Sequence, residues 1–109
     1  MIARGRTYGC PVELSLTMLG GKWKTVILAR LKQGPLRYGD LRRLIPDLSE
    51  KVLTQRLHEL EEDGFIFRKQ DVGESRYHMS ERGASLQPVL LALYKWGLDE
   101  AALHDAKFR

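Results

Sequence analysis

The chain has 109 residues, of which 43% are hydrophobic and 29% charged, a composition typical of one globular domain spanning residues 1–109. This balance argues against disorder, and no run of residues reaches the roughly 18 apolar positions that a membrane-spanning helix needs. A single cysteine, and the lack of an apolar run behind the basic N-terminus, argue against a secreted protein. We therefore expect a cytoplasmic protein without membrane association.

The charge is unevenly distributed along the chain, whose formal net charge is +4. Residues 1–58 carry 11 Lys or Arg against 4 Asp or Glu, whereas residues 59–109 carry 7 against 10. Such asymmetry is expected when one surface meets a polyanion and another does not. It favours a nucleic-acid partner, although solvated faces also differ in charge by chance.

Two helices are predicted in the N-terminal third. Pro11 has the backbone angle favoured at the first position of a helix, and apolar residues follow it until Gly20-Gly21, which suits a helix C-terminus. A second helix is predicted over residues 22–33, where a Gly-Pro pair ends it. Its apolar residues recur at helical spacing: Trp23, Val26, Ile27 and Leu31.

Two further helices joined by a tight turn predict a helix-turn-helix. After a short connector over residues 36–38, a third helix is expected over residues 39–45, and its inner side is formed by Leu41, Leu44 and Ile45. Pro46-Asp47 breaks this helix, and Ser49 is a favourable N-cap for a fourth helix that reaches about Asp63. Gly64 then ends the fourth helix.

The pattern changes after the fourth helix. Residues 65–67 are β-prone, Gly73 marks a turn and residues 76–79 alternate polar and apolar, so we predict a β-hairpin with its tip near residues 72–75. Ser80 then caps a long C-terminal helix that reaches about His104 and bends near Pro88. The predicted fold class is mainly α with a small β-hairpin, a winged helix-turn-helix with a long C-terminal helix.

The fourth helix has the features of a DNA-recognition helix. Leu53, Leu57 and Leu60 fall on one narrow stripe at roughly 100° per residue, and polar residues occupy the opposite face. Acidic residues crowd its C-terminal half, against the helix dipole, which is explained if only the N-terminal half meets DNA. A solvated amphipathic helix is the alternative. The residues expected to contact DNA here are Ser49, Lys51, Thr54, Gln55, Arg56 and His58.

Basic residues outside this helix are candidates for phosphate contacts, which need only well-placed cations. They are informative as a set, because any one of them is equally well explained as a solvated charge. Those of the helices and their connectors are Lys22, Lys24, Arg37, Arg42 and Arg43, and those of the hairpin are Arg68, Lys69 and Arg76.

The chain also carries an ordered series of short motifs. The first are Cys10-Pro11-Val12-Glu13, Leu19-Gly20-Gly21-Lys22-Trp23, Gly34-Pro35-Leu36-Arg37-Tyr38 and Asp40-Leu41. There follow Ile45-Pro46, Leu48-Ser49, Leu53-Thr54-Gln55-Arg56-Leu57, Leu60-Glu61-Glu62-Asp63-Gly64, Tyr77, Ser80-Glu81-Arg82-Gly83, Leu86-Gln87-Pro88-Val89-Leu90 and Trp96-Gly97. The series resembles the HxlR-type winged-helix regulators, which are related to the MarR-like regulators. It covers residues 8–100 and is far more specific than a lone motif.

The resemblance implies a homodimer that binds an imperfect palindrome of double-stranded DNA near a promoter, as a repressor or an activator. Family members dimerise through their first and last helices. The last helix here carries more apolar residues than one buried stripe needs, although a helix that only covers its own core is the alternative. The residues expected at the dimer interface are Val12, Leu16, Leu86, Val89, Leu90, Leu93, Tyr94 and Trp96. The hairpin departs from the family by being shorter and lacking a Pro-Pro pair.

Cys10 lies directly before Pro11, at a predicted helix N-cap where the helix dipole favours a thiolate. Several family members sense disulfide stress, quinones or aldehydes through a cysteine at the matching position. The resemblance therefore implies a small oxidant or electrophile as a partner of Cys10, and a small buried residue at the dimer seam is the alternative. Because the chain has no second cysteine, a protein disulfide would join Cys10 of two protomers.

No enzyme site is expected. His58, His78 and His104 lie in three different predicted elements and one cysteine does not complete a zinc site, so no catalytic residue, metal or cofactor is predicted. The predicted function is sequence-specific DNA binding in transcription regulation. The alternative is a winged-helix module for protein–protein assembly, which the polar outer face of the fourth helix disfavours.

Overall fold

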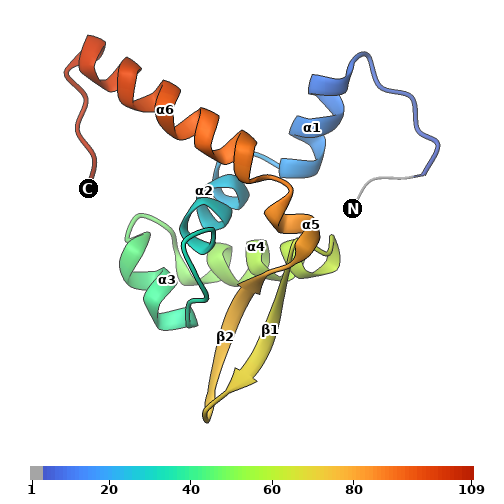
Figure 1. Cartoon of the computed structure of the whole chain (residues 1–109), viewed down its shortest axis with the longest axis vertical. Helices are drawn as coiled ribbons and strands as arrows, with labels where there is room; N and C mark the ends of the chain where they lie inside the picture. Colours follow the sequence, from blue (N-terminus) through green and yellow to red (C-terminus); the bar gives the residue numbers. More distant parts are fainter. Residues whose placement is uncertain (1–3) are drawn as a thin grey trace.

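The computed structural model describes residues 4–109 as a mainly helical chain with one two-stranded antiparallel hairpin. The predicted winged helix-turn-helix is confirmed (Figure 1). The elements are α1 (Pro11–Leu19), α2 (Lys22–Leu31), α3 (Tyr38–Leu44), α4 (Glu50–Glu62), β1 (Ile66–Asp71), β2 (Glu74–Met79), α5 (Glu81–Ala84) and α6 (Gln87–His104).

The first four helices lie where local signals predict them, although α2 ends at Leu31 instead of residue 33 and α3 covers Tyr38–Leu44 instead of residues 39–45. Gly20 ends α1 in the left-handed conformation, with φ of 59°, and its N–H donates to the carbonyl oxygen of Leu16. Ser49 caps α4, because its side-chain oxygen accepts a hydrogen bond from the N–H of Val52 at 3.2 Å. These terminal contacts satisfy backbone groups that the helix itself leaves unpaired.

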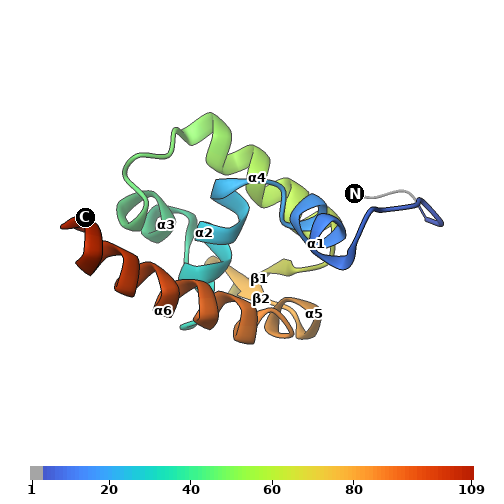
Figure 2. The ribbon, with the colours of Figure 1, turned by 90° about the horizontal axis from the view of Figure 1, so that it is seen from above.

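The core lies between α2, α3 and α4, and all three leucines of the predicted α4 stripe are buried in it. Leu44 was predicted on the inner side of α3, and this is wrong, because 41% of it is exposed. The other two predicted residues, Leu41 and Ile45, are buried, and Leu48 is buried beside them. Figures 1 and 2 show α2 between α4 and α6, so α2 connects α4 to the C-terminal helix.

The hairpin of β1 and β2, called the wing below, projects away from α1 and α6 (Figure 1). Its register runs from the Ile66–Met79 pair to the Asp71–Glu74 pair. The turn is the two-residue Val72-Gly73, narrower than the predicted tip, and both residues have positive φ, of 50° and 77°. The predicted connector over residues 36–38 forms an isolated antiparallel β-bridge with β2, because Leu36 and Tyr77 exchange two backbone hydrogen bonds of 3.1 and 2.8 Å.

The prediction of one bent C-terminal helix is wrong. Ser80 caps the short α5, and the helix is interrupted at residues 85–86 before α6 begins. Pro88 lies in the first turn of α6, where no helical hydrogen bond needs the N–H that proline lacks. Gly83 of α5 lies against the start of β1, and a Cβ there would come within 2.2 Å of the Phe65 carbonyl oxygen. Only glycine therefore lets α5 pack so close to the wing.

Candidate nucleic-acid interface

The outer face of α4 is exposed and polar. Lys51, Thr54, Gln55 and His58 are exposed while the leucine stripe is buried, so the sequence placed these side chains on the correct side of the helix. His58 Nε2 lies 2.6 Å from a carboxylate oxygen of Glu62, one turn later. Direct contact of these residues with DNA stays a prediction.

The first half of α4 is held by α3, the other helix of the motif. The Tyr38 hydroxyl lies 3.2 Å from the Thr54 hydroxyl and donates to the Glu50 carbonyl oxygen at 3.4 Å. Arg42 of α3 forms an ion pair with Glu50 at 3.2 Å. These contacts make the two helices one unit and orient the outer face of α4.

The acidic second half of α4 is explained by cations that lie next to it. Lys24 of α2 is buried, and its Nζ lies 3.9 Å from Glu59 and 3.8 Å from Asp63. Arg56 also pairs with Glu59, and this hydrogen bond is the main cause that lowers the pKa of the Glu59 carboxyl. Arg56 is therefore half-buried and already paired within α4, and Lys24, a predicted phosphate contact, is inside the fold, so neither is freely available to DNA.

The third acid of this half faces the wing. Glu61 lies 3.6 Å from the guanidinium of Arg68 on β1, and that guanidinium also lies over the ring of Tyr77 at 5.8 Å. Three of the acids therefore have a structural role that the helix dipole alone does not suggest: Glu59 and Asp63 attach α4 to α2, and Glu61 attaches it to the wing.

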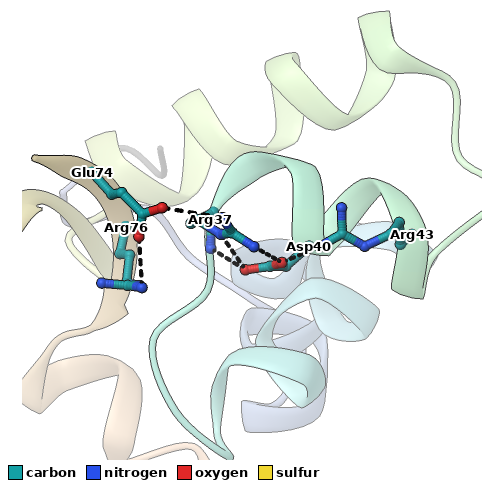
Figure 3. A network of polar contacts seen from close by, with 5 residues as sticks. All are labelled: Arg37, Asp40, Arg43, Glu74 and Arg76. Atoms are coloured by element: carbon teal, nitrogen blue, oxygen red, sulfur yellow. Dashed lines mark hydrogen bonds and ion pairs between the residues drawn. The ribbon is translucent and has the colours of Figure 1, made fainter.

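A second polar network joins α3 to the wing (Figure 3). Arg37 donates from Nε and Nη2 to the two oxygens of Asp40 at 3.2 and 3.0 Å, and from Nη1 to Glu74 at 3.1 Å. Arg76 donates to the other Glu74 oxygen at 2.7 Å, and Arg43 pairs with Asp40. Side-chain and then backbone hydrogen bonds from Arg37 lower the pKa of Asp40 to about 2, so this carboxylate is charged at neutral pH.

These contacts divide the predicted phosphate-binding residues into two groups. One group already holds a carboxylate, namely Lys24, Arg37, Arg42, Arg43, Arg68 and Arg76. The other group makes no ion pair within residues 4–109 and consists of Lys22, whose Nζ lies over the Trp23 ring at 4.3 Å, and Lys69. The second group is better placed to bind phosphate, because no intramolecular ion pair has to be broken.

An exposed apolar surface covers α1 and α6, at the end of the molecule opposite the wing tip (Figure 1). Leu16 of α1 and Trp96 of α6 are each 65% exposed. Two predicted interface residues lie elsewhere: Leu90 is buried in its own core, with 3% exposed, and Leu86 packs against that core. Leu103, on the last turn of α6, is 76% exposed and was not predicted. The apolar surface is formed by Val12, Leu16, Val89, Leu91, Leu93, Tyr94, Trp96, Leu98 and Leu103.

Cys10 occupies the predicted N-cap of α1 and is exposed. Its side chain makes no capping hydrogen bond, although its carbonyl oxygen accepts one from the N–H of Leu14 at 3.3 Å. A small oxidant therefore has access to the sulfur in the single chain.

Two other features bear on the predicted functions. Within residues 4–109, no group of three or more His, Cys, Asp or Glu side chains could hold a metal ion. No helix in the same part of the chain is long and apolar enough to cross a membrane.

A helix-turn-helix followed by a two-stranded wing defines a winged helix-turn-helix transcriptional regulator. Residues 18–105 match the HxlR-like helix-turn-helix family, and the chain belongs to this family. The HTH-type transcriptional regulator YtcD of Bacillus subtilis (strain 168), named as uncharacterized, is 44% identical over 95 residues, which cover 84% of this chain and 75% of YtcD.

Two similar solved structures are of redox-related regulators. The redox regulator HypR in its oxidized form has a TM-score of 0.76 and 35% identity, over 83% of this chain and 96% of HypR. The quinone-bound YodB from B. subtilis has a TM-score of 0.69 and 32% identity, over 83% of this chain and 99% of YodB. The resemblance stated from the sequence motifs is therefore confirmed at the level of the family.

Proposed function

We propose that this transcriptional regulator is a homodimer that binds an imperfect palindrome of double-stranded DNA through the two copies of α4. The observation that carries the proposal is the exposed polar face of α4, which contacts from α3 hold in place. The apolar surface of α1 and α6 lies at the end away from the wing, and α2 lies between α4 and α6, so this surface can pair two copies without blocking α4. Two recognition helices then enter successive major grooves about 34 Å apart.

Within this proposal the side chains have different tasks. Gln55 and Lys51 read base edges, because both are exposed on the outer face of α4 and free of intramolecular ion pairs within residues 4–109. Thr54 contributes a hydroxyl that Tyr38 already orients. Lys22 and Lys69 contact phosphates and add a salt-dependent attraction that is independent of sequence.

Gln55→Ala tests base reading. We expect affinity for the cognate duplex to fall by about 1–3 kcal/mol, because a bidentate contact to one base is lost, and specificity at that base to relax. The cognate duplex is obtained by selecting bound sequences from a random pool, and affinity is measured by fluorescence anisotropy.

Gln33→Ala is the matched control, since Gln33 is also exposed but lies in the turn after α2, outside the helix-turn-helix. Equal losses by Gln55→Ala on cognate and unrelated duplexes would show that Gln55 does not read a base. A wild-type protein that selects no sequence at all would instead favour a module for protein–protein assembly.

We further propose that Cys10 senses small oxidants or electrophiles. Three observations support this: the exposed sulfur, its place at a helix N-terminus, and similarity to regulators solved in an oxidized and a quinone-bound form. Since the chain has one cysteine, the oxidised product is a disulfide between two protomers or a mixed disulfide with a small thiol.

Cys10→Ser is expected to bind the selected duplex as the wild type does and to lose its response to diamide or benzoquinone. Serine keeps an N-cap side chain of similar size but has no thiolate to oxidise or alkylate. The measurement is DNA affinity before and after treatment, with mass spectrometry of the cysteine. A variant that still responds to both reagents would eliminate Cys10 as the sensor.

A further inference from the structure

The wing requires support from the rest of the molecule. A hairpin of two strands is at best marginally stable by itself. In this structure the Leu36–Tyr77 pair holds the wing at one place, through the two backbone hydrogen bonds described above. Glu74 is three residues closer to the tip than Tyr77, which is about 10 Å along the strand. A support at Glu74 would therefore limit movement of the outer part of the wing.

Arg37 provides that support. It follows Leu36 directly, and its guanidinium reaches Glu74 at 3.1 Å while two of its other nitrogens bind Asp40. The Arg37 backbone N–H also donates to Asp40, at 2.9 Å. A bidentate arginine–carboxylate pair has a fixed geometry, so Asp40 sets the direction in which Arg37 approaches the wing. Arg76 holds the other Glu74 oxygen and thereby orients the carboxylate toward Arg37.

We propose that Arg37 is a positioning residue: its bridge to Glu74 fixes the wing relative to α3 and α4 for DNA binding, and Arg37 does not itself bind phosphate. The inference rests on the proposed function. It assigns a task to a residue that the sequence presented only as one of several candidate phosphate contacts. It also explains why an acid, Glu74, lies close to the expected DNA surface: its carboxylate is the acceptor of the bridge.

The two roles of Arg37 predict opposite effects of a change at Glu74. If Arg37 and Arg76 bind phosphate, Glu74→Gln removes a repulsive charge and releases both arginines, so DNA affinity rises. If the bridge positions the wing, Glu74→Gln removes the bridge and DNA affinity falls. Loss of Arg37 weakens DNA binding in either case, because it removes a positive charge. Whether Glu74→Gln raises or lowers DNA affinity therefore distinguishes the two roles of Arg37.

The experiment compares Arg37→Gln, Glu74→Gln and the double variant with the wild-type dimer. Asp71→Asn is the matched control, since Asp71 pairs with Glu74 in the hairpin register and its change removes the same charge. Asp71 makes no ion pair within residues 4–109. Affinity is measured on the selected duplex and on an unrelated duplex, and hydrogen exchange of the wing amides is measured on the free protein.

We expect Arg37→Gln and Glu74→Gln each to weaken binding by roughly three- to tenfold, and the double variant to be no weaker than Arg37→Gln, because both changes remove one bridge. Both are expected to accelerate exchange in the outer part of the wing, whereas Asp71→Asn leaves exchange unchanged and does not weaken binding. The proposal would be overturned if Glu74→Gln bound DNA more tightly than the wild type, or if the losses of affinity in the two single variants added up in the double variant. Unchanged hydrogen exchange of the wing amides in both single variants would also overturn it. The exchange measurement needs no DNA, so it tests the bridge even if the wild type binds no duplex and the proposed function fails.

Discussion

Trp96→Glu is expected to convert the proposed dimer into monomers and to weaken binding to the selected duplex by about 100-fold or more. Trp96 is the largest side chain of the apolar surface, and 65% of it is exposed in the single chain. In a symmetric interface the same patch serves both copies, so one substitution buries two carboxylates that have no partner. Monomers bind each half-site separately and lose the high effective concentration with which a dimer binds its second half-site.

Sedimentation equilibrium measures the oligomeric state, and anisotropy measures affinity on full and half sites. Lys95→Gln is the control: it changes the net charge by the same amount at the neighbouring exposed position of α6 without removing an apolar side chain. A Trp96→Glu protein that stays dimeric would show that α6 does not form the interface. A monomer with unchanged affinity would show that DNA binding does not depend on dimerisation.

Lys24→Met is expected to lower the free energy of unfolding by about 3–5 kcal/mol, the usual cost of removing one partner of a buried ion pair. Lys24 is 7% exposed and so is Asp63, and the cluster that they form with Glu59 connects α2 to the end of α4. Methionine fits the space of the lysine stem but leaves the two carboxylates without that cation. Chemical denaturation measures the loss.

Lys22→Met is the matched control, because it makes the same replacement two residues earlier, at an exposed lysine. It is expected to change the free energy of unfolding by less than about 0.5 kcal/mol while weakening non-specific DNA binding. If Lys24→Met were as stable as Lys22→Met, the cluster would contribute nothing to the position of α4. In that case the acidic end of the recognition helix would again need an explanation.

The order of the elements was predictable because local signals specify it. Pro11, Gly20 and Ser49 act through their own backbone angles or through side chains that reach only the next turn, so their effects are readable in the sequence. The stripe of Leu53, Leu57 and Leu60 follows from helical periodicity in the same way. The ordered series of motifs, which is also read directly from the sequence, identified the family.

The sequence-based predictions were wrong where burial or helix packing depends on residues distant in the sequence. Leu44 and Leu90 carry the same side chain, yet the first is exposed and the second is buried, since burial depends on which helices pack against each position. The close packing of α5 on the start of the wing depends on Gly83, which has to meet the Phe65 carbonyl oxygen. No local pattern contains that contact.

By itself, the sequence determined which segments form helices, which form the wing, and which face of α4 is polar. The tertiary structure decided which charges are available to DNA. Lys24, Arg37 and Arg68 have the same charge as Lys51, but folding brings carboxylates from other elements to the first three. Charge pairing acts through space over a few ångströms, and only the folded chain defines those distances.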